Sequence, residues 1–167
     1  MNQLEKFRDV HTFLFDVDGV LTNSQVLVLE EGKLLRKMSI RDGYAIKKAV
    51  QEGYRVGIIT GGRSEGVKIR LQNLGVTDIY LGVVDKFEVY QEFSDLYQLD
   101  VDGILYMGDD IPDYQIMRKV GLPCCPKNAA PEIKEISLYI SPYSGGEGCA
   151  RDVIEKVLRL HQKWTPE

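Results

Sequence analysis

The chain has 167 residues, a formal net charge of −4 and a 44% share of hydrophobic residues. This length suits one domain, which we expect to span residues 1–167, because a second domain would leave each half with a marginal core. Charged residues interrupt every apolar run and no dense stripe of Lys and Arg occurs, so we expect neither a membrane nor a nucleic acid as partner. The expected partner is a small molecule.

The cysteines and histidines indicate which cellular compartment and which kind of metal ligand to expect. Cys124 and Cys125 are adjacent and Cys149 is distant, which is not the spacing of a disulfide framework or a zinc site. The two histidines, His11 and His161, lie at opposite ends of the chain. Residues 1–9 lack the apolar stretch of a secretory signal. We therefore predict a cytoplasmic protein with reduced thiols, in which any metal is held by oxygen.

Short apolar runs alternate with segments of helical periodicity along the chain. Strands are predicted at residues 12–15, 55–59, 79–81 and 104–107, with weaker candidates at residues 122–125 and 138–140. Apolar residues recur with helical spacing around residues 45–50, 67–74, 89–97 and 153–161. Strands that alternate with helices predict an α/β fold, a doubly wound parallel sheet of Rossmann-like type with helices on both faces.

The segment after the first strand departs from this alternation. Residues 25–30 and 33–38 flank Glu31 and Gly32, which predicts a β-hairpin that projects from the sheet. Neither residues 16–60 nor residues 60–86 much exceed the ~40 residues below which an independently folded cap is doubtful. We therefore predict no cap domain. The hairpin and the glycine-rich loop at residues 145–148 are the segments expected to exclude water from a site.

Polar residues gather directly after the predicted strands. In open α/β sheets, ligands bind at the carboxyl ends of the strands, so we expect these residues to meet in one site. They are Asp16, Asp18, Thr60, Gly61, Gly62, Lys86, Asp109, Asp110 and Asp113. Carboxylates that gather in one place raise each other's pKa values unless a cation intervenes, and Mg²⁺ prefers oxygen ligands. The sequence therefore predicts a Mg²⁺ site that includes Asp16 and Asp109, with Lys86 as a second positive charge.

The same residues predict phosphoryl-transfer chemistry. Asp16 would attack phosphorus and form an aspartyl-phosphate, which splits one difficult displacement into two easier ones. Asp18, two residues away on the same face of extended chain, would protonate the leaving oxygen and later take a proton from water. The Thr60 hydroxyl and the backbone N–H groups of Gly61 or Gly62 would bind the phosphoryl oxygens.

Several residues also have ordinary structural interpretations. An Asp-x-Asp-Gly segment alone is often a turn or a helix cap. For Asp113, anchoring Lys86 or capping a helix is the alternative to a direct role in the site. Asp42 is predicted to be an N-cap. Arg63 and Arg70 would either clamp a substrate carboxylate or lie solvated on the surface, and the sequence leaves both interpretations open.

Taken together, the motifs resemble those of the haloacid dehalogenase superfamily of phosphatases. The matching segments are Phe-Asp-Val-Asp-Gly-Val-Leu-Thr at residues 15–22, Ile-Thr-Gly at residues 59–61, Lys86, and Gly-Asp-Asp-Ile-Pro-Asp at residues 108–113. Nearly the whole chain also resembles the small capless branch that contains the 3-deoxy-D-manno-octulosonate 8-phosphate (KDO 8-phosphate) phosphatases. The segments that carry this second resemblance are Arg-Asp-Gly at residues 41–43, Val-Asp-Lys at residues 84–86, Gly121-Leu122, and Gly-Gly-Glu-Gly at residues 145–148 followed by Arg151.

The resemblance implies a role for each matched residue. By it, Asp16 is the nucleophile and Asp18 the general acid/base, while Thr60 and Lys86 bind the phosphoryl group. It also implies a Mg²⁺ ion bound by Asp16, the Asp18 carbonyl and Asp109. The branch implies a homotetramer in which neighbouring subunits close each site, and a phosphorylated sugar acid of lipopolysaccharide biosynthesis as substrate.

Three departures from the pattern leave the sugar open. Gly62 stands where many members have Arg, with Arg63 one position later, Glu147 stands where the branch often has Arg, and Asn23 replaces a frequent Asp. The 9-phosphate of a nine-carbon sugar acid, of the KDN or N-acylneuraminate type, is therefore the alternative substrate.

Other classes of protein share parts of this pattern. A signalling receiver domain would place its Lys near the end of the domain, whereas Lys86 precedes Asp109 and Asp110. A phosphomutase needs a cap to retain its intermediate. A catalytically inactive binding subunit would keep the fold without turnover, and remains the non-enzymatic alternative.

Overall fold

A computed structural model describes residues 2–166 of the chain. The main sheet has six parallel strands in the order β5-β4-β1-β6-β7-β8. The strands are β1 (Thr12–Phe15), β4 (Arg55–Ile59), β5 (Asp78–Tyr80), β6 (Ile104–Met107), β7 (Leu122–Cys125) and β8 (Tyr139–Ile140). The chain runs outward from β1 through β4 and β5 and then returns to β6 on the other side of β1. The direction of winding therefore reverses beside β1.

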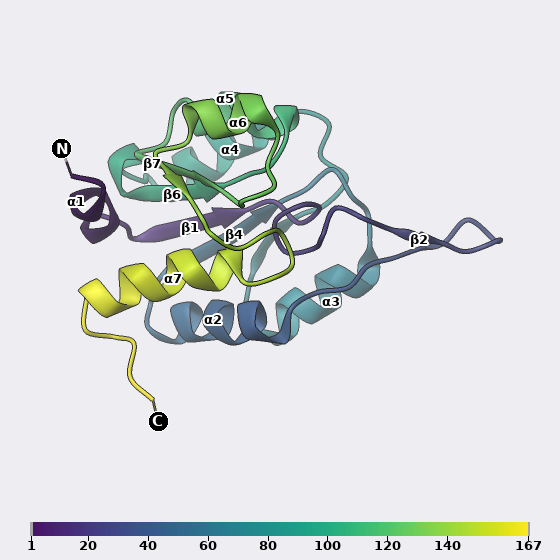
Figure 1. Ribbon diagram of the computed structural model, residues 1–167, viewed down its shortest axis with the longest axis horizontal. Helices are drawn as coiled ribbons and strands as arrows, with labels where there is room; N and C mark the ends of the chain where they lie inside the picture. The colour runs from purple at the N-terminus through teal and green to yellow at the C-terminus, as the bar shows by residue number, and fades with distance from the viewer. Residues whose placement is uncertain (1, 167) are drawn as a thin grey trace.

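Helices cover both faces of this sheet. They are α1 (Gln3–Arg8), α2 (Ile40–Gln51), α3 (Glu65–Asn73), α4 (Lys86–Leu96), α5 (Tyr114–Met117), α6 (Pro131–Ile136) and α7 (Cys149–Leu160), with 3-10 turns η1 (Val101–Gly103) and η2 (Ile111–Asp113). In Figure 1, α2, α3 and α7 lie below the sheet and α4, α5 and α6 above it. The predicted doubly wound α/β fold is confirmed. Among the described residues, no helix has the length and apolar content that a membrane crossing requires.

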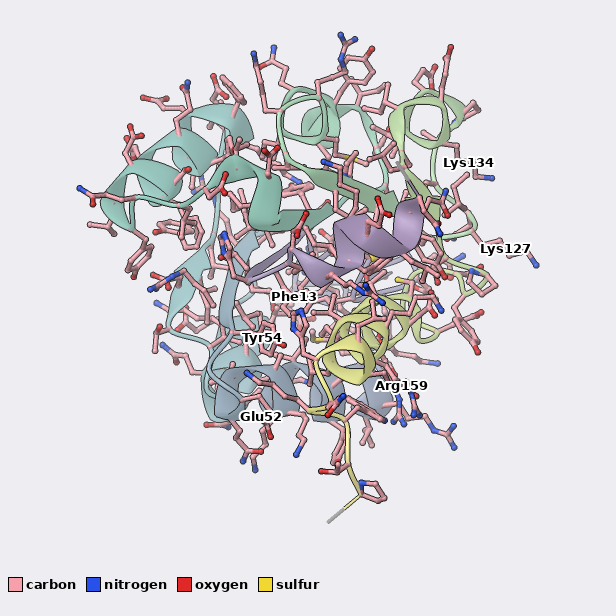
Figure 2. The ribbon with its side chains drawn as sticks, turned by 90° about the vertical axis from the view of Figure 1, so that its left-hand side faces the viewer. Phe13, Glu52, Tyr54, Lys127, Lys134 and Arg159 are labelled. Carbon is pink, nitrogen blue, oxygen red and sulfur yellow. The ribbon has the colours of Figure 1, made fainter. Side chains whose placement is uncertain are left out.

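Both faces of the sheet are buried, which explains why its strands read as unbroken apolar runs. In β1, Phe13 and Phe15 join the core cluster that includes α2 and α7, whereas Leu14 joins the cluster on the opposite face. Phe13 also packs against Tyr54, with 5.5 Å between the ring centroids. Figure 2, viewed from the side on which α1 lies, shows both rings inside the molecule and Lys134 pointing outward. A core packed on both faces fixes the positions of the strand ends.

Most of the predicted element boundaries agree with the structure. β1, β4, β6 and β7 span the predicted residues, β5 begins and ends one residue earlier than predicted, and β8 is one residue shorter. The four predicted helices correspond to α2, α3, α4 and α7. The helices α1, α5 and α6 were not predicted, because helices of 6, 4 and 6 residues are too short to show a helical period.

The predicted hairpin is present but its paired part is short. Its antiparallel strands are β2 (Leu27–Val28) and β3 (Leu34–Leu35), and Gly32 in its turn has a φ of +88°. The hairpin projects well beyond the rest of the molecule (Figure 1). Apart from it, the described residues between Asp16 and Lys86 form only α2, β4, α3 and β5, so this part of the chain holds no cap domain, as predicted.

Hydrogen bonds at helix N-termini place two residues of interest. Asp85 caps α4 by accepting from two backbone N–H groups of its first turn, which puts Lys86 at the first helical position. The prediction that Asp42 is an N-cap is wrong, because Ser39 caps α2 and accepts from the N–H of Asp42 at 3.2 Å. The Asp42 carboxylate accepts instead from the N–H of Arg151 at 3.0 Å, in the first turn of α7. It thereby ties α2 to α7.

Candidate active site

The predicted residues at the strand ends lie together on the side where the winding reverses. Asp16 follows β1, Thr60 follows β4, Asp109 follows β6, and Lys86 begins α4. A reversal of winding opens a crevice at the carboxyl ends of the strands, where ligands bind in this class of fold. Asp16, Thr60 and Lys86 are nevertheless only 6%, 2% and 7% exposed. These polar groups are therefore held against the protein rather than free in solvent.

Lys86 is the cation at the centre of this cluster. Its Nζ lies 3.0 Å from Asp16 Oδ2 and 2.8 Å from Asp113 Oδ1. Burial alone would lower the pKa of Lys86, but the two neighbouring carboxylates outweigh it and raise the pKa overall. Asp16 Oδ1 accepts from the N–H of Val17 at 2.7 Å. Each oxygen of the Asp16 carboxylate therefore has a partner, which fixes its orientation.

Asp113 is the acceptor that holds Lys86 in place. It is fully buried, and it accepts from the hydroxyl of Tyr106 at 2.6 Å and from the N–H of Asp109 at 3.0 Å, besides Lys86. Burial raises the pKa of Tyr106 well above its ordinary value, so this hydroxyl stays protonated and donates. Both oxygens of Asp113 are engaged within the protein. This geometry matches the anchoring interpretation of Asp113.

The acidic residues of the cluster suit a hard divalent cation. One oxygen from each of Asp16, Asp109 and Asp113 lies within 4.8 Å of the others. Burial, then the Asp113 carboxylate, raises the pKa of Asp16 well above its ordinary value, and burial with Asp113 and Asp110 raises the pKa of Asp109 to about 7. A cation removes this cost of gathering charge, and an all-oxygen site fits Mg²⁺. Asp110 itself is exposed, and its carboxylate accepts from the N–H of Ile111.

Asp18 has a partner that the sequence did not predict. Arg36, which directly follows β3, donates from Nε to Asp18 Oδ1 at 2.7 Å and from a terminal nitrogen to Oδ2 at 3.1 Å. The Arg36 side chain is 8% exposed and that of Asp18 is 39% exposed. No sequence signal pointed to this pair, because it depends on how the hairpin folds back over the loop after β1.

The residues after β4 occupy different surroundings. The Thr60 hydroxyl accepts from the N–H of Gly62 at 3.1 Å, which closes a tight turn at the strand end. Arg63 lies against the turn after β5, because a Cβ atom added to Gly82 would be 2.9 Å from the Nε of Arg63. Arg70 donates to the backbone carbonyl of Ser39 at 3.4 Å, at the start of α2. The structure does not bring Arg70 to the Asp16 cluster, and substrate binding by Arg63 or Arg70 stays a prediction.

The glycine-rich loop at residues 145–148 packs directly on the loop after β1. The N–H of Gly146 donates to the carbonyl of Val20 at 2.9 Å. A Cβ on Gly145 would lie 2.0 Å from the carbonyl oxygen of Gly19, so only glycine fits there. Glu147 is exposed beside this contact. The loop therefore packs on the segment that follows the Asp16 cluster in the sequence, and its exclusion of water from the site stays a prediction.

Gly19 itself allows Asp109 to approach the loop after β1. It has a φ of +91°, and a Cβ there would lie 1.8 Å from Asp109 Oδ2, whereas Gly53 has a φ of +87° and nothing within 4 Å of its Cβ position. Gly53→Ala should therefore lower the free energy of unfolding by only about 1 kcal/mol, because only the backbone conformation is strained. Gly19→Ala should lower it by about 2–4 kcal/mol, because the new methyl group also overpacks against Asp109. Urea unfolding of both variants measures the difference. Equal losses would contradict the close contact between Gly19 and Asp109.

Comparison with known proteins decides the family. A family model of haloacid dehalogenase-like hydrolases matches residues 72–152. The 3-deoxy-D-manno-octulosonate 8-phosphate phosphatase KdsC of Yersinia pestis is 30% identical over 160 residues, which cover 96% of this chain and 86% of that protein. The chain belongs to the haloacid dehalogenase-like hydrolases. The resemblance drawn from the motifs is confirmed, and a signalling receiver domain is excluded.

Solved structures of this hydrolase family agree with the fold and the cofactor. The crystal structure of the Yersinia pestis phosphatase is 30% identical, covers 96% of this chain and 86% of its own, and superposes with a TM-score of 0.93. The phosphatase from Moraxella catarrhalis, in complex with magnesium, phosphate and KDO, is 29% identical, with coverages of 94% and 90% and a TM-score of 0.90. The magnesium of that complex and the acidic cluster found here both support Mg²⁺ as the cofactor of this hydrolase.

Proposed function

We propose that this hydrolase is a Mg²⁺-dependent phosphomonoesterase that cleaves KDO 8-phosphate, in lipopolysaccharide sugar biosynthesis, through an aspartyl-phosphate on Asp16. The observation that carries the proposal is the position of Lys86, with its ammonium bound to both Asp16 and Asp113 beside the Asp109 carboxylate. An orientated carboxylate next to a buried cation is the arrangement that phosphoryl transfer to a carboxylate requires. The names of the Yersinia pestis and Moraxella catarrhalis relatives supply the sugar.

The first half of the proposed reaction transfers the phosphoryl group to the protein. A carboxylate oxygen of Asp16 attacks phosphorus, and the bond between phosphorus and the sugar oxygen breaks. Asp18 in its protonated form gives its proton to that oxygen, so a neutral alcohol leaves. Lys86, the Thr60 hydroxyl and the backbone N–H of Gly61 bind the phosphoryl oxygens, since the N–H of Gly62 already donates to Thr60.

The second half restores the enzyme. Water attacks the phosphorus of the aspartyl-phosphate, Asp18 takes a proton from it, and the bond between phosphorus and the Asp16 oxygen breaks. The products are inorganic phosphate and a free Asp16 carboxylate. Mg²⁺, held by the Asp16 and Asp109 carboxylates and the Asp18 carbonyl, would supply positive charge against the phosphoryl oxygens.

Assembly and location complete the proposal. The hairpin exposes Leu27 and Val28, each at 62%, and Ile40 just beyond it is 81% exposed. Apolar side chains on a projecting hairpin support a subunit contact there, and the resemblance to the capless branch supplies the homotetramer in which neighbouring subunits close each site. Analytical ultracentrifugation measures that state. All three cysteines are free, which agrees with a reducing compartment and the cytoplasmic location that we propose.

Phosphate release tests the proposed activity and its metal requirement. The purified protein should release phosphate from KDO 8-phosphate faster than from hexose phosphates or nine-carbon sugar acid 9-phosphates. Removing metal with EDTA should abolish turnover, and added Mg²⁺ should restore it. Mg²⁺ should also raise the melting temperature, because it binds only the folded acidic cluster.

The outcomes separate the alternatives. A preference for a KDN or N-acylneuraminate 9-phosphate would keep the mechanism and change the substrate to the alternative that the departures at Gly62 and Glu147 leave open. Folded protein that binds these sugar phosphates in calorimetry without releasing phosphate would identify an inactive binding subunit. Turnover that persists in EDTA would contradict the metal requirement.

A further inference from the structure

The contact between Arg36 and Asp18 joins the hairpin to the loop after β1. Nε and a terminal nitrogen of Arg36 reach the two oxygens of one carboxylate, at 2.7 and 3.1 Å. A two-point contact of this kind fixes the rotation of the carboxylate plane, which a single hydrogen bond or a lysine would leave free. Exposed ion pairs contribute little to stability, but here the arginine side chain is only 8% exposed. The pair is therefore built into the site.

The paired groups also lie against the turn after β4. A Cβ on Gly62 would be 3.1 Å from a terminal nitrogen of Arg36, 3.2 Å from Asp18 Oδ2 and 3.5 Å from the Thr60 hydroxyl. Arg36, Thr60 and Gly62, together with Val17, line a cavity of only about 10 Å³, barely the room of one water molecule. Arg36 also borders two larger open hollows, of about 330 and 400 Å³, so its guanidinium is held on this side by its two hydrogen bonds to Asp18 rather than by close packing all round. Asp18 is consequently held beside the groups that would bind the phosphoryl oxygens.

We propose that Arg36 is a positioning residue, which sets the orientation of the Asp18 carboxylate towards the leaving oxygen of the substrate. The inference rests on the proposed phosphatase function and adds the hairpin to its machinery. Arg36 acts through Asp18, so its contribution should appear only where proton donation by Asp18 matters. Alkoxide leaving groups such as those of sugar phosphates need that proton, whereas p-nitrophenolate leaves readily without it.

Leaving-group dependence tests the inference. In Arg36→Gln, kcat/KM for KDO 8-phosphate should fall about 10- to 100-fold, as part of the range that general acid catalysis contributes, and that for p-nitrophenyl phosphate about threefold or less. kcat/KM is the suitable constant, because it reports only the steps up to the first phosphoryl transfer. Arg36→Lys should recover only part of the loss, because it restores the charge without the two-point contact. Lys37→Gln, which changes the exposed next residue in the segment after β3, is the matched control and should behave like the wild type.

A double-mutant cycle gives a second readout. In an Asp18→Asn background, Arg36→Gln should cause no further loss of kcat/KM, because a residue that acts through Asp18 has nothing left to orient. Equal losses of kcat/KM for both substrates, or full additivity with Asp18→Asn, would mean that Arg36 has only a structural role. Either result would overturn the inference while the proposed function stands. If the wild type shows no turnover that depends on Asp16, the proposed function itself falls, and the inference falls with it.

Discussion

Asp16→Asn is expected to abolish phosphate release, with a loss of about 10⁴-fold or more, as when a nucleophile is removed from other covalent hydrolases. An amide does not attack phosphorus, so no aspartyl-phosphate forms on that side chain. Initial rates of phosphate release, with Mg²⁺ and KDO 8-phosphate at saturation, measure the loss. Because both halves of the proposed reaction depend on Asp16, p-nitrophenyl phosphate should show the same loss, unlike the pattern expected for Arg36.

The Asp16 variant should still fold, which makes the activity loss interpretable. Asn can keep the hydrogen bond that Asp16 Oδ1 accepts from Val17, and Lys86 keeps its contact with Asp113. Asp102→Asn is the matched control, because it makes the same change at an exposed carboxylate outside the cluster. Near-wild-type turnover by a folded Asp16→Asn protein would rule out Asp16 as the nucleophile, whatever the behaviour of the control.

The sheet could be predicted because its information is local. Both faces of β1 and β6 are buried, so residues 12–15 and 104–107 read as uninterrupted apolar runs with sharp ends. The polar residue after each run then falls at the carboxyl edge of the sheet, which is why Asp16, Thr60 and Asp109 were predicted to meet. The order of the strands along the chain was therefore enough to predict most residues of the site.

What the sequence missed depends on distant contacts. Arg36 lies 18 residues from Asp18, and nothing in either segment shows that the hairpin folds back over the loop. Asp42 has the sequence features of an N-cap, yet it accepts from Arg151 in α7, 109 residues away. Asp113 had two interpretations until its partner Lys86 and its burial were known. In each case the residue type indicated a polar contact, and only the fold identified the partner.

The second large effect is expected on stability, at Asp113. Asp113→Ala removes the acceptor of Lys86, of the Tyr106 hydroxyl and of the Asp109 N–H, all inside the protein. Breaking a buried ion pair by removing one partner costs about 3–5 kcal/mol, and Lys86 keeps only its contact with Asp16. Removing the Asp113 charge also relieves repulsion on Asp16 and Asp109, so the lower end, about 3 kcal/mol, is expected. Urea unfolding measures it.

Two matched variants show whether the loss comes from the buried network. Tyr106→Phe removes one donor and keeps the ion pair, so it should cost about 1 kcal/mol. Asp110→Ala removes an exposed carboxylate that accepts from Ile111 at the start of η2, and should cost no more than about 1 kcal/mol. If Asp113→Ala were no worse than Asp110→Ala, Lys86 would not depend on Asp113 for its position. A loss confined to Asp113 would mean that the charge placed for phosphoryl transfer is held by the same interactions that stabilise the fold.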